Sequence, residues 1–586
     1  MSPELGSLAT GVRARAGRAY YRGSNEGRYL YLCFKSGLFG IEPPKKTAKI
    51  VKAFAEYGML GALVTIAALR HPDQRAVIDE RGTLTYRELD QRIDALANSW
   101  LAQGLKAGDG VMVLTRNHRG FVEALIAAAK CGARVILMNT GFSAPQIREV
   151  AQREGTDLIV YDEEYASAVA PIEARLGKYR AFTESDHEGA DTLATLIASN
   201  AAIPAPPKPA HAPRLVILTS GTTGTPKGAG RDVPWSLSPV GGPLTKVPFR
   251  SCEVTEICAP MFHALGFSQM LLAVGLGSTL VLQRRFDPQA VLDSLERNRA
   301  TAMIAVPVML QRILALPADQ LEGRDLSALR IIYVSGSQLG IDLTRRVLRT
   351  FGPKLYNLYG STEVTFATIA TPEDLEAEPG CVGKIVPGAV VKILGPDDQA
   401  LPVGATGRIF VGNVIRFEGY TGGADKQRVG ALVSSGDVGH FDHAGRLFID
   451  GRDDEMIISG GENVFPREVE ELLGEHPGVL EAAVIGVADE KFGQRLLAFV
   501  VPAAGVQLDE DLIKRYVQEH LARYKVPREV RFLAELPRNQ TGKILKRELL
   551  SAALAGSAAQ TVAAGVAGEA AEGTAGSEQS ASEPAL

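Results

Sequence analysis

The chain has 586 residues and a mass of 62.5 kDa, and 46% of its residues are hydrophobic and 22% are charged. At about 150 residues per domain this length predicts more than one domain, and the composition excludes a wholly disordered or fibrous chain. The net charge is −4. The last stretch after Glu548 holds four acids and no basic residue, so the body is balanced, which argues against nucleic-acid binding.

Cysteine use and apolar runs indicate the setting of the protein. The five cysteines are scattered and form no C-x-x-C pair, which favours neither a disulfide framework nor a structural zinc site. A reducing, cytoplasmic setting fits best. The longest apolar run, residues 59–69, is about half of the roughly 20 residues that a membrane span needs, so we expect a soluble protein.

Residues 1–70 are expected to form an N-terminal extension. Five arginines between residues 13 and 28 precede the aromatic residues Tyr29, Tyr31, Phe34 and Phe39 and then the apolar run. Basic residues beside aromatics and a short apolar helix could lie on a membrane surface. The alternative is that these groups pack on the main body, and we prefer it because the sequence shows no clean amphipathic face.

From residue 76 the pattern alternates between strand and helix. Thr85 and Glu88 form a T-x-x-E capping box that predicts a helix start, and Gly104 predicts its end. Buried strands are predicted over 111–115, 134–138 and 158–161, with helices over 121–130 and 145–154 between them. Such alternation predicts a mainly parallel sheet that is covered on both faces.

The alternation continues after a proline-rich stretch, residues 203–213, which we interpret as a connector between subdomains. A strand is predicted over 215–219, and further strand and helix segments follow over 302–313 and 331–335. Between residues 381 and 450, short strands with Gly and Asp turns predict a small β subdomain.

After Gly451 a separate compact unit is expected, with strands near 483–486 and 497–501 and a helix over about 509–521. Residues 551–586 contain Ala, Gly, Ser and Glu and no aromatic residue, so we predict a disordered tail. The predicted domains are therefore the extension 1–70, a large domain 71–452, a small domain 453–550 and the tail 551–586. The fold class is α/β for the large domain, with a β subdomain, and α+β for the small one.

The segment from Leu218 to Gly228, LTSGTTGTPKG, carries the strongest chemical signal. Its glycines allow a close backbone approach, and its hydroxyls and Lys227 offer donors to an anion, which is what a polyphosphate needs from a loop. It is not a Walker A loop, because Lys227 follows a proline and precedes a glycine.

This loop resembles the phosphate-binding signature of the adenylate-forming superfamily, which includes acyl- and aryl-CoA synthetases, luciferases and peptide-synthetase adenylation domains. Further segments that resemble its motifs follow in order: SGSQL from Ser335, YGSTE from Tyr359, SGDVG from Ser435, GRDDEMIISGG from Gly451 and PRNQTGK from Pro537. The resemblance spans about residues 70–550. It implies a nucleotide site made of Thr219, Ser220, Gly221, Thr222, Thr223, Gly224, Thr225, Lys227, Gly336, Ser337, Tyr359, Gly360, Thr362, Asp437 and Arg452.

The resemblance also implies ATP, Mg²⁺ and CoA as cofactors and assigns roles to single residues. Tyr359 would stack on adenine, and Asp437 would accept hydrogen bonds from the ribose hydroxyls. Glu363 would hold Mg²⁺, which prefers oxygen ligands. Lys543 would bridge the carboxylate and the α-phosphate, where charge repulsion is the main barrier. The predicted catalytic set consists of Lys543, Glu363 and Thr222, and Thr222 would donate to a phosphate.

The motif from Gly451 resembles the superfamily's hinge. Arg452 would contact the ribose or a phosphate, and Asp454 would be the pivot about which a small mobile domain swings after adenylation. That motion would withdraw Lys543 and present another face for thiol attack, a form of conformational gating. Gly461 would then line the passage for the pantetheine arm of CoA.

The segment around His263 bears on the choice of acid. Peptide-synthetase adenylation domains place an aspartate there to pair with an amino group, whereas this chain reads Ala259-Pro-Met-Phe-His-Ala-Leu-Gly-Phe267 and resembles acyl- and aryl-CoA synthetases. His263, Gly266 and Val306 are therefore the predicted acyl-pocket residues. For His263 a hydrogen-bonded core position, and for Val306 simple core packing, explain the pattern equally well.

The leading hypothesis is an ATP-dependent carboxylic acid:CoA ligase that forms acyl-AMP and then acyl-CoA from a medium- or long-chain fatty acid. One alternative is an acyl-AMP ligase that hands the acyl group to a carrier protein, and another is a catalytically silent nucleotide-binding homologue. The segment 422–428 departs from the family pattern, which weakens assignment to a subfamily. The expected partners are the acid, ATP and CoA, with no nucleic acid and at most weak peripheral membrane contact.

Overall fold

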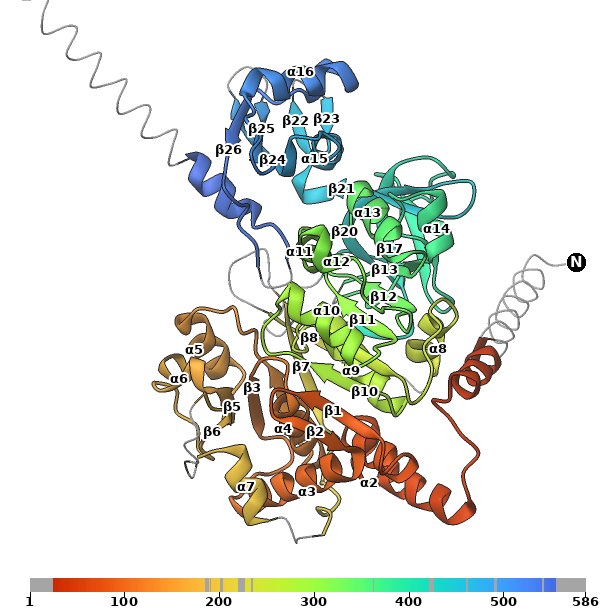
Figure 1. Cartoon of the computed structure of the whole chain (residues 1–586), viewed down its shortest axis with the longest axis vertical. Helices are drawn as coiled ribbons and strands as arrows, with labels where there is room; N and C mark the ends of the chain where they lie inside the picture. Colours follow the sequence, from red (N-terminus) through yellow and green to blue (C-terminus); the bar gives the residue numbers. More distant parts are fainter. Residues whose placement is uncertain are drawn as a thin grey trace, which may run out of the picture. The chain divides into compact units, whose positions relative to one another are not determined.

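The computed structural model describes residues 25–184, 189, 191–200, 204–219, 227–232, 236–361, 363–420, 426–459, 462–489, 493–539 and 542–554. The chain divides into two compact units, one formed mainly by Met1–Asp450 and the other mainly by Gly451–Asn539 and the segment from Lys543 (Figure 1). The boundary falls two residues before the predicted one. Each unit is described by itself.

The large unit contains a nine-stranded sheet whose central strands are parallel. Parallel strands need a crossover connection rather than a tight turn. Along the sheet the strands are β15 (Lys384–Ile385), β14 (Thr368–Ala370), β13 (Leu355–Tyr359), β12 (Ile331–Val334), β11 (Ala302–Ala305), β9 (Val254–Ile257), β10 (Thr279–Leu282), β1 (Arg75–Asp79) and β2 (Gly82–Thr85). Strands β13 to β1 in this order run parallel, and β15, β14 and β2 extend the two edges as antiparallel strands.

A seven-stranded sheet forms the second layer of the large unit. Its strands are β18 (Arg416–Tyr420), β8 (Lys227–Asp232), β7 (Arg214–Thr219), β4 (Arg134–Leu137), β3 (Gly110–Leu114), β5 (Thr156–Asp162) and β6 (Lys178–Phe182). Strands β7 to β6 run parallel, and β8 and β18 are antiparallel. The third sheet is the predicted β subdomain, made of β16 (Val390–Leu394), β17 (Gly407–Gly412), β20 (Leu432–Phe441), β19 (Arg428–Val429) and β21 (Leu447–Arg452).

Helices cover the two parallel sheets, as the alternation predicts. In chain order they are α2 (Pro44–Arg70), α3 (Tyr86–Ala102), α4 (Arg119–Lys130), α5 (Ala144–Arg153), α6 (Ala166–Val169), α7 (Leu193–Ser199), α8 (Ser238–Leu244), α9 (Ala264–Gly275), α10 (Pro288–Arg297), α11 (Pro307–Leu314), α12 (Ala318–Leu321), α13 (Ile341–Phe351) and α14 (Pro372–Ala377). The capping box at Thr85 opens α3 as predicted. Figure 1 shows α2, α3 and α4 grouped at the lower end of the large unit.

Helix α4 is buried along its whole length and lies within the largest hydrophobic core, which both parallel sheets share. Its buried charges are paired: Lys130 Nζ lies 2.9 Å from Asp90 and 2.5 Å from Asp94, and Glu123 bonds Arg92. Such pairing is needed because an isolated charge in an apolar core is costly.

Two predictions, one about a connection and one about the tail, are wrong. The proline-rich stretch follows α7 and leads into β7. The strands before and after it, β6 and β7, belong to the same seven-stranded sheet, so the stretch does not separate subdomains. It runs over α2 and α3, where Tyr57 and the Asn98 amide donate to the carbonyls of Pro206 and Pro204. The tail does not begin at residue 551, because a helix over 546–554 buries Leu549 and Ala553. Residues 555–586 lie outside the described part of the chain.

The small unit is a sheet covered on both faces. Its strands are β23 (Glu462–Val464), β22 (Ile457–Ser459), β25 (Gly493–Pro502), β24 (Val479–Asp489) and β26 (Glu529–Phe532), and its helices are α15 (Pro466–Gly474) and α16 (Glu510–His520). Val484 packs with α15 and α16 on one face, whereas Ala483 and Ile485 pack with the helix over 546–554 on the other. This alternation follows from the two-residue repeat of a strand. The predicted fold class, α/β with a small α+β unit, is confirmed.

Candidate active site

Four predicted site residues follow four neighbouring parallel strands of the nine-stranded sheet. His263 comes after β9, Val306 directly follows β11, Gly336 comes after β12, and Tyr359 ends β13. Because parallel strands present their carboxyl ends at one edge, the sheet gathers these residues along that edge, where ligands of open α/β sheets bind. The order β13, β12, β11, β9 places the predicted adenine side next to the predicted acyl side.

His263 is the N-terminal flanking residue of α9 and lies against Phe262, with ring centroids 4.5 Å apart. Burial lowers the pKa of its imidazole to about 4, so the ring is neutral at pH 7. Its Nε2 is buried and makes no hydrogen bond to the described residues. The ring therefore offers an uncharged, unpaired polar atom among apolar neighbours.

Asn117 holds the segment before His263, and the sequence analysis missed it. Its amide donates to the carbonyls of Ile257 and Ala259 at 3.1 and 2.9 Å and accepts from the Met261 amide at 2.9 Å. Asn117 follows β3 of the seven-stranded sheet, so it ties the two parallel sheets together at this point. A polar residue just after a buried strand was the available signal, since strand ends in parallel sheets carry functional groups.

Gly266 and Gly336 have different surroundings. A Cβ at Gly266 would lie 2.4 Å from the carbonyl oxygen of Pro260, so close packing of α9 on the preceding segment requires glycine there. At Gly336 a Cβ would lie 3.5 Å from Val306 Cγ1, which puts the predicted nucleotide loop, with Ser337, beside the predicted acyl-pocket residue. The pocket roles of Gly266 and Val306 stay predictions.

Tyr359 and Asp437, which belong to two different sheets, meet directly. The Tyr359 hydroxyl donates to Asp437 Oδ2 at 2.5 Å. Asp437 lies in a bulge of β20, because Phe410 pairs with Ser434 while Arg408 pairs with Val438. Gly436 in this bulge has φ 82°, a conformation that glycine adopts without a steric penalty. The bulge re-aims the aspartate toward Tyr359, so the predicted adenine and ribose contacts are adjacent.

The turn after β13 presents Glu363. Gly360 allows the tight return of the chain, since a Cβ there would lie 2.4 Å from the carbonyl oxygen of Thr365. Ser361 Oγ donates to Glu363 Oε2 at 2.7 Å and fixes the carboxylate. In the described residues no group of three or more His, Cys, Asp or Glu forms a metal site. One carboxylate that shares the ion with substrate phosphates is the usual arrangement for Mg²⁺, and Glu363 fits it.

The predicted phosphate loop connects two strands of a hairpin. Strand β7 pairs antiparallel with β8, with Thr219 opposite Lys227. The loop thus leaves the carboxyl end of a parallel-sheet strand, as a phosphate loop should. Ser220, Gly221, Thr222, Thr223, Gly224 and Thr225 lie outside the described residues, as does Thr362, so their predicted roles stay predictions.

In the small unit, Arg452 and Asp454 form a two-bond ion pair. Arg452 Nε lies 2.9 Å from Asp454 Oδ1, and Nη2 lies 3.2 Å from Oδ2. Partial burial opposes ionisation of Asp454, but the hydrogen bonds and charge of Arg452, with a smaller contribution from Lys543, lower its pKa. The predicted pivot is therefore ionised and lies within electrostatic reach of the predicted catalytic lysine. Gly461 lies outside the described residues.

Lys543 is exposed and belongs to a turn that is fixed at its base. The Lys543 amide donates to the Asn539 side chain at 2.9 Å, the Asn539 amide donates to the Lys543 carbonyl, and Arg538 bridges to Ile544. Directly after it, Lys546 bonds Glu455 and Glu470, each at 2.9 Å. The backbone of the turn is thus anchored in the small unit while its lysine side chain extends into solvent.

Comparisons with known proteins agree with this geometry. Residues 64–421 match the AMP-binding enzyme family, and residues 468–543 match the AMP-binding enzyme C-terminal domain. The chain belongs to the AMP-binding enzyme family. The adenylate-forming resemblance is thereby confirmed, and with it the reaction class of an AMP-forming acid–thiol ligase that uses ATP, Mg²⁺ and CoA.

Relatives in this family differ in their acids and acceptors. The chain is 33% identical to the indoleacetate–CoA ligase of Aromatoleum aromaticum, over 82% of this chain and 95% of that protein. It is 31% identical to the fatty acid–[acyl-carrier-protein] ligase ScoC of Streptomyces coeruleorubidus, over 82% and 94%. Among solved structures, ATP-bound MatB from Rhodopseudomonas palustris superposes with a TM-score of 0.74 at 27% identity, covering 84% of this chain and 98% of that one.

Proposed function

We propose that this ligase activates a carboxylic acid whose remainder is uncharged and apolar, in the first place a medium- or long-chain fatty acid, and transfers the acyl group to CoA. The observation that carries the proposal is His263, a half-buried, neutral imidazole beside Phe262 whose Nε2 is buried and unbonded among the described residues, at the predicted acyl end of the row of strand ends. A substrate with an ammonium group would need a carboxylate there, since an unpaired charge is costly to bury. We also propose a cytoplasmic location, which is supported by the five free cysteines.

The first half-reaction joins two anions. The substrate carboxylate oxygen attacks the α-phosphorus of ATP, the bond to the bridging oxygen breaks, and pyrophosphate leaves, which gives acyl-AMP. Asp437 and Tyr359 would hold the nucleoside, and Lys543 would neutralise the charge where carboxylate and phosphate meet. Mg²⁺ held by Glu363 would neutralise the phosphates.

The second half-reaction transfers the acyl group. The CoA sulfur attacks the acyl carbon, the bond to the phosphate oxygen breaks, the thiol proton is lost to solvent, and AMP leaves. The small unit, pivoting at Asp454, would withdraw Lys543 and bring Gly461 to line the thiol's path. A lid that acts in the first step and leaves for the second is a form of gating.

The relatives indicate two alternatives, one for the acid and one for the acceptor. An aromatic acid is favoured by the similarity to an indoleacetate–CoA ligase, because a ring could stack in the same apolar surroundings and offer a group to His263 Nε2. A carrier-protein acceptor is favoured by the similarity to a fatty acid–[acyl-carrier-protein] ligase. Both keep the adenylation step unchanged.

The test is an assay of AMP release and acyl-CoA formation over acids from acetate to long-chain fatty acids, with benzoate, indoleacetate and amino acids included. We expect the highest kcat/KM with dodecanoate or a longer acid, and none with amino acids. A maximum with indoleacetate or benzoate would support the aromatic candidate. Acyl-AMP formed without acyl-CoA would support a carrier acceptor, and no pyrophosphate exchange with any acid would contradict the enzyme hypothesis.

A further inference from the structure

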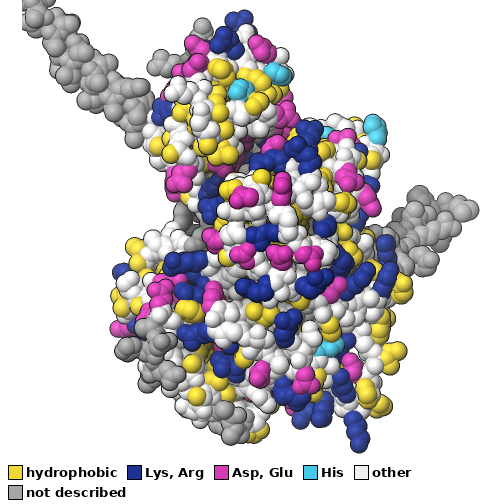
Figure 2. Space-filling view, viewed as in Figure 1, with side chains coloured by type: hydrophobic (Ala, Val, Ile, Leu, Met, Phe, Trp, Pro, Cys, Tyr) yellow, Lys and Arg dark blue, Asp and Glu magenta, His cyan; other side chains and the backbone are white. Residues whose placement is uncertain are grey.

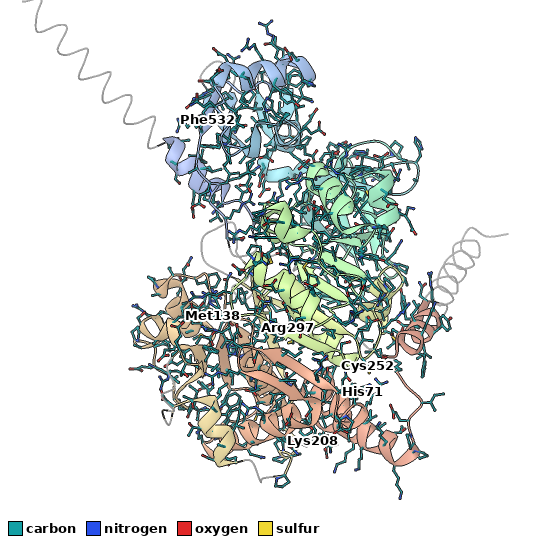
Figure 3. The ribbon with its side chains drawn as sticks, viewed as in Figure 1. His71, Met138, Lys208, Cys252, Arg297 and Phe532 are labelled. Carbon is teal, nitrogen blue, oxygen red and sulfur yellow. The ribbon has the colours of Figure 1, made fainter. Side chains whose placement is uncertain are left out.

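Helix α2 has two halves with different surroundings. It kinks at Gly58, where φ is 69° and ψ is −173°. After the kink, Ala62, Val64 and Ala67 are buried in the large unit, where α2 packs on α3, α4 and α9. His71, at its end, lies beside Cys252, with Nδ1 and Sγ 3.5 Å apart (Figure 3). The second half is therefore part of the body of the enzyme.

The first half of α2 presents an exposed face of mixed basic and apolar character. Spacings of three and four residues put Lys45, Lys49 and Lys52 on one helical stripe, and the neighbouring stripe carries Ala48, Val51 and Ala55. All six are exposed. Ile41, just before the helix, and Met59, just after the kink, flank these stripes in the chain and are 96% and 65% exposed. We call these eight residues the basic apolar face.

The exposed apolar side chains are concentrated in this part of the molecule. Of the thirteen large hydrophobic residues that are exposed in the described part of the chain, six lie between residues 25 and 59: Leu30, Tyr31, Phe34, Ile41, Val51 and Met59. Figure 2 shows hydrophobic and Lys/Arg side chains together at the lower right, where Figure 1 places α2. Three of the six, Ile41, Val51 and Met59, belong to the basic apolar face, and exposed apolar side chains gathered in this way mark an interaction surface.

The charge of the same segment is opposite to that of the whole chain. Residues 25–70 contain seven basic and three acidic residues, although the chain has a net charge of −4. The acids are engaged: Glu26 accepts from Ser236, Glu42 pairs with Lys46 and Arg70, and Glu56 lies 3.8 Å from Lys52. Lys45 and Lys49 form no ion pair with any described residue, so their charges face solvent.

We propose that the basic apolar face docks this enzyme on the surface of an anionic lipid bilayer. Apolar side chains would enter the boundary between headgroups and acyl chains, and the lysines would reach the lipid phosphates and carboxylates beside them. The face lies before the whole of the segment that matches the AMP-binding family, which begins at residue 64. It is thus an addition to the ligase fold, and the inference does not depend on which acid is activated.

Other occupants fit the charge less well. Residues 1–24 contain four arginines and one glutamate, so they would repel this face and add to its attraction for anions. A second copy related by twofold symmetry would set the same patch against itself and bring the two lysine stripes together. An anionic surface has the complementary sign.

The face indicates docking on the surface of a bilayer rather than crossing it. By length and composition alone α2 could span a membrane, and it is the one helix of the described residues that could. Its second half, apart from the exposed Met59 next to the kink, is packed in the large unit, however, and is not available to lipid. The half that carries the lysines is available to lipid. A helix with this pattern of basic and apolar residues lies in the plane of the membrane–water interface.

The test is sedimentation of the full-length enzyme with phosphatidylcholine vesicles that contain or lack phosphatidylserine. We expect binding to the anionic vesicles that weakens as salt is raised. The combined variant Lys45→Glu, Lys49→Glu, Lys52→Glu should bind at least about 100-fold more weakly, at about a fivefold loss for each of the three lysines. Val51→Asp with Ile41→Asp should weaken binding without changing the lysines.

The matched control reverses three exposed basic residues elsewhere, Lys106→Glu, Arg148→Glu and Lys392→Glu, and should bind like wild type. AMP release in vesicle-free buffer should be equal in all variants, which shows that they are folded. Absence of binding to anionic vesicles, or equal loss in the control, would overturn the proposal. So would a dimer in solution that the lysine variant dissociates while lipid binding is absent.

Discussion

The strand ends of the large unit and the lysine turn of the small unit present their predicted site residues by different means. His263, Val306 and Tyr359 are positioned by the register of neighbouring parallel strands, and Asp437 by a bulge that meets Tyr359. Lys543 instead extends exposed from a turn whose backbone alone is fixed. The difference suggests a division of labour in which a rigid platform holds the nucleotide and the acid while a separate unit supplies the cation.

The largest effect is expected at the lysine turn. Lys543→Ala should slow acyl-AMP formation by about 10²–10³-fold, because the charge that meets carboxylate and phosphate is lost, and should leave conversion of supplied acyl-AMP to acyl-CoA unchanged. Pyrophosphate exchange and thioester formation measure the two steps. Arg547→Ala, at an exposed position four residues on, is the control and should spare both; equal loss of the two steps in folded Lys543→Ala would show that the lysine is not specific to the first.

The opposite pattern is expected at Gly461. Gly461→Leu should spare pyrophosphate exchange and reduce acyl-CoA formation by roughly 10²-fold, because a side chain would obstruct the thiol's path and a misplaced thiol loses its proximity advantage. Gly461→Ala, with a smaller side chain, should lose less. Loss of exchange in Gly461→Leu would contradict the passage role.

At the platform, loss of a charged contact should act on nucleotide affinity. Asp437→Ala should raise KM for ATP by about 10- to 100-fold, the effect of removing charge-assisted hydrogen bonds. Tyr359→Phe keeps the ring and removes only the donor to Asp437, so its KM should rise by less. If Tyr359→Phe were as damaging as Asp437→Ala, the two residues would act through their mutual bond rather than through separate contacts.

The rigidity of the platform can be tested at Asn117. Asn117→Ala removes three hydrogen bonds and leaves buried backbone groups without partners, so the free energy of unfolding should fall by about 2–4 kcal/mol. KM for the acid should rise, because the His263 segment loses its support. Asn98→Ala, which removes one exposed contact to Pro204, is the control and should cost less than about 1 kcal/mol; an equal cost would contradict the role of Asn117 in joining the two sheets.

The smallest effect concerns pH. The pKa of His263 is about 4 in the folded enzyme and near 6.5 when unfolded, so the unfolded state binds the extra proton first as pH falls. Stability should therefore drop between pH 6.5 and 4, by up to about 2 kcal/mol from pH 7 to pH 5. Urea unfolding of His263→Leu should show a shallower acid limb than wild type, and an unchanged limb would mean that the imidazole is not buried.

How far the sequence predicted the site depends on the kind of signal. Thr85 and Glu88 fix the start of α3 through contacts three residues apart, so the prediction was accurate. Asn117 was missed because its partners at residues 257–261 are remote in sequence. The proline-rich stretch was misassigned since proline content indicates a loop but not which strands the loop joins.

The local sequence determined the alternation of strands and helices, the capping of α3 and the motif residues Tyr359, Asp437, Arg452 and Lys543, because periodic burial and loop chemistry act over a few residues. The tertiary structure alone decided that β9, β11, β12 and β13 are neighbours, that a bulge at Gly436 brings Asp437 to Tyr359, and that one half of α2 is buried while the other presents its lysines. Strand order, sheet contact and the exposed face of a helix are set by pairing between distant segments, which a local pattern does not encode.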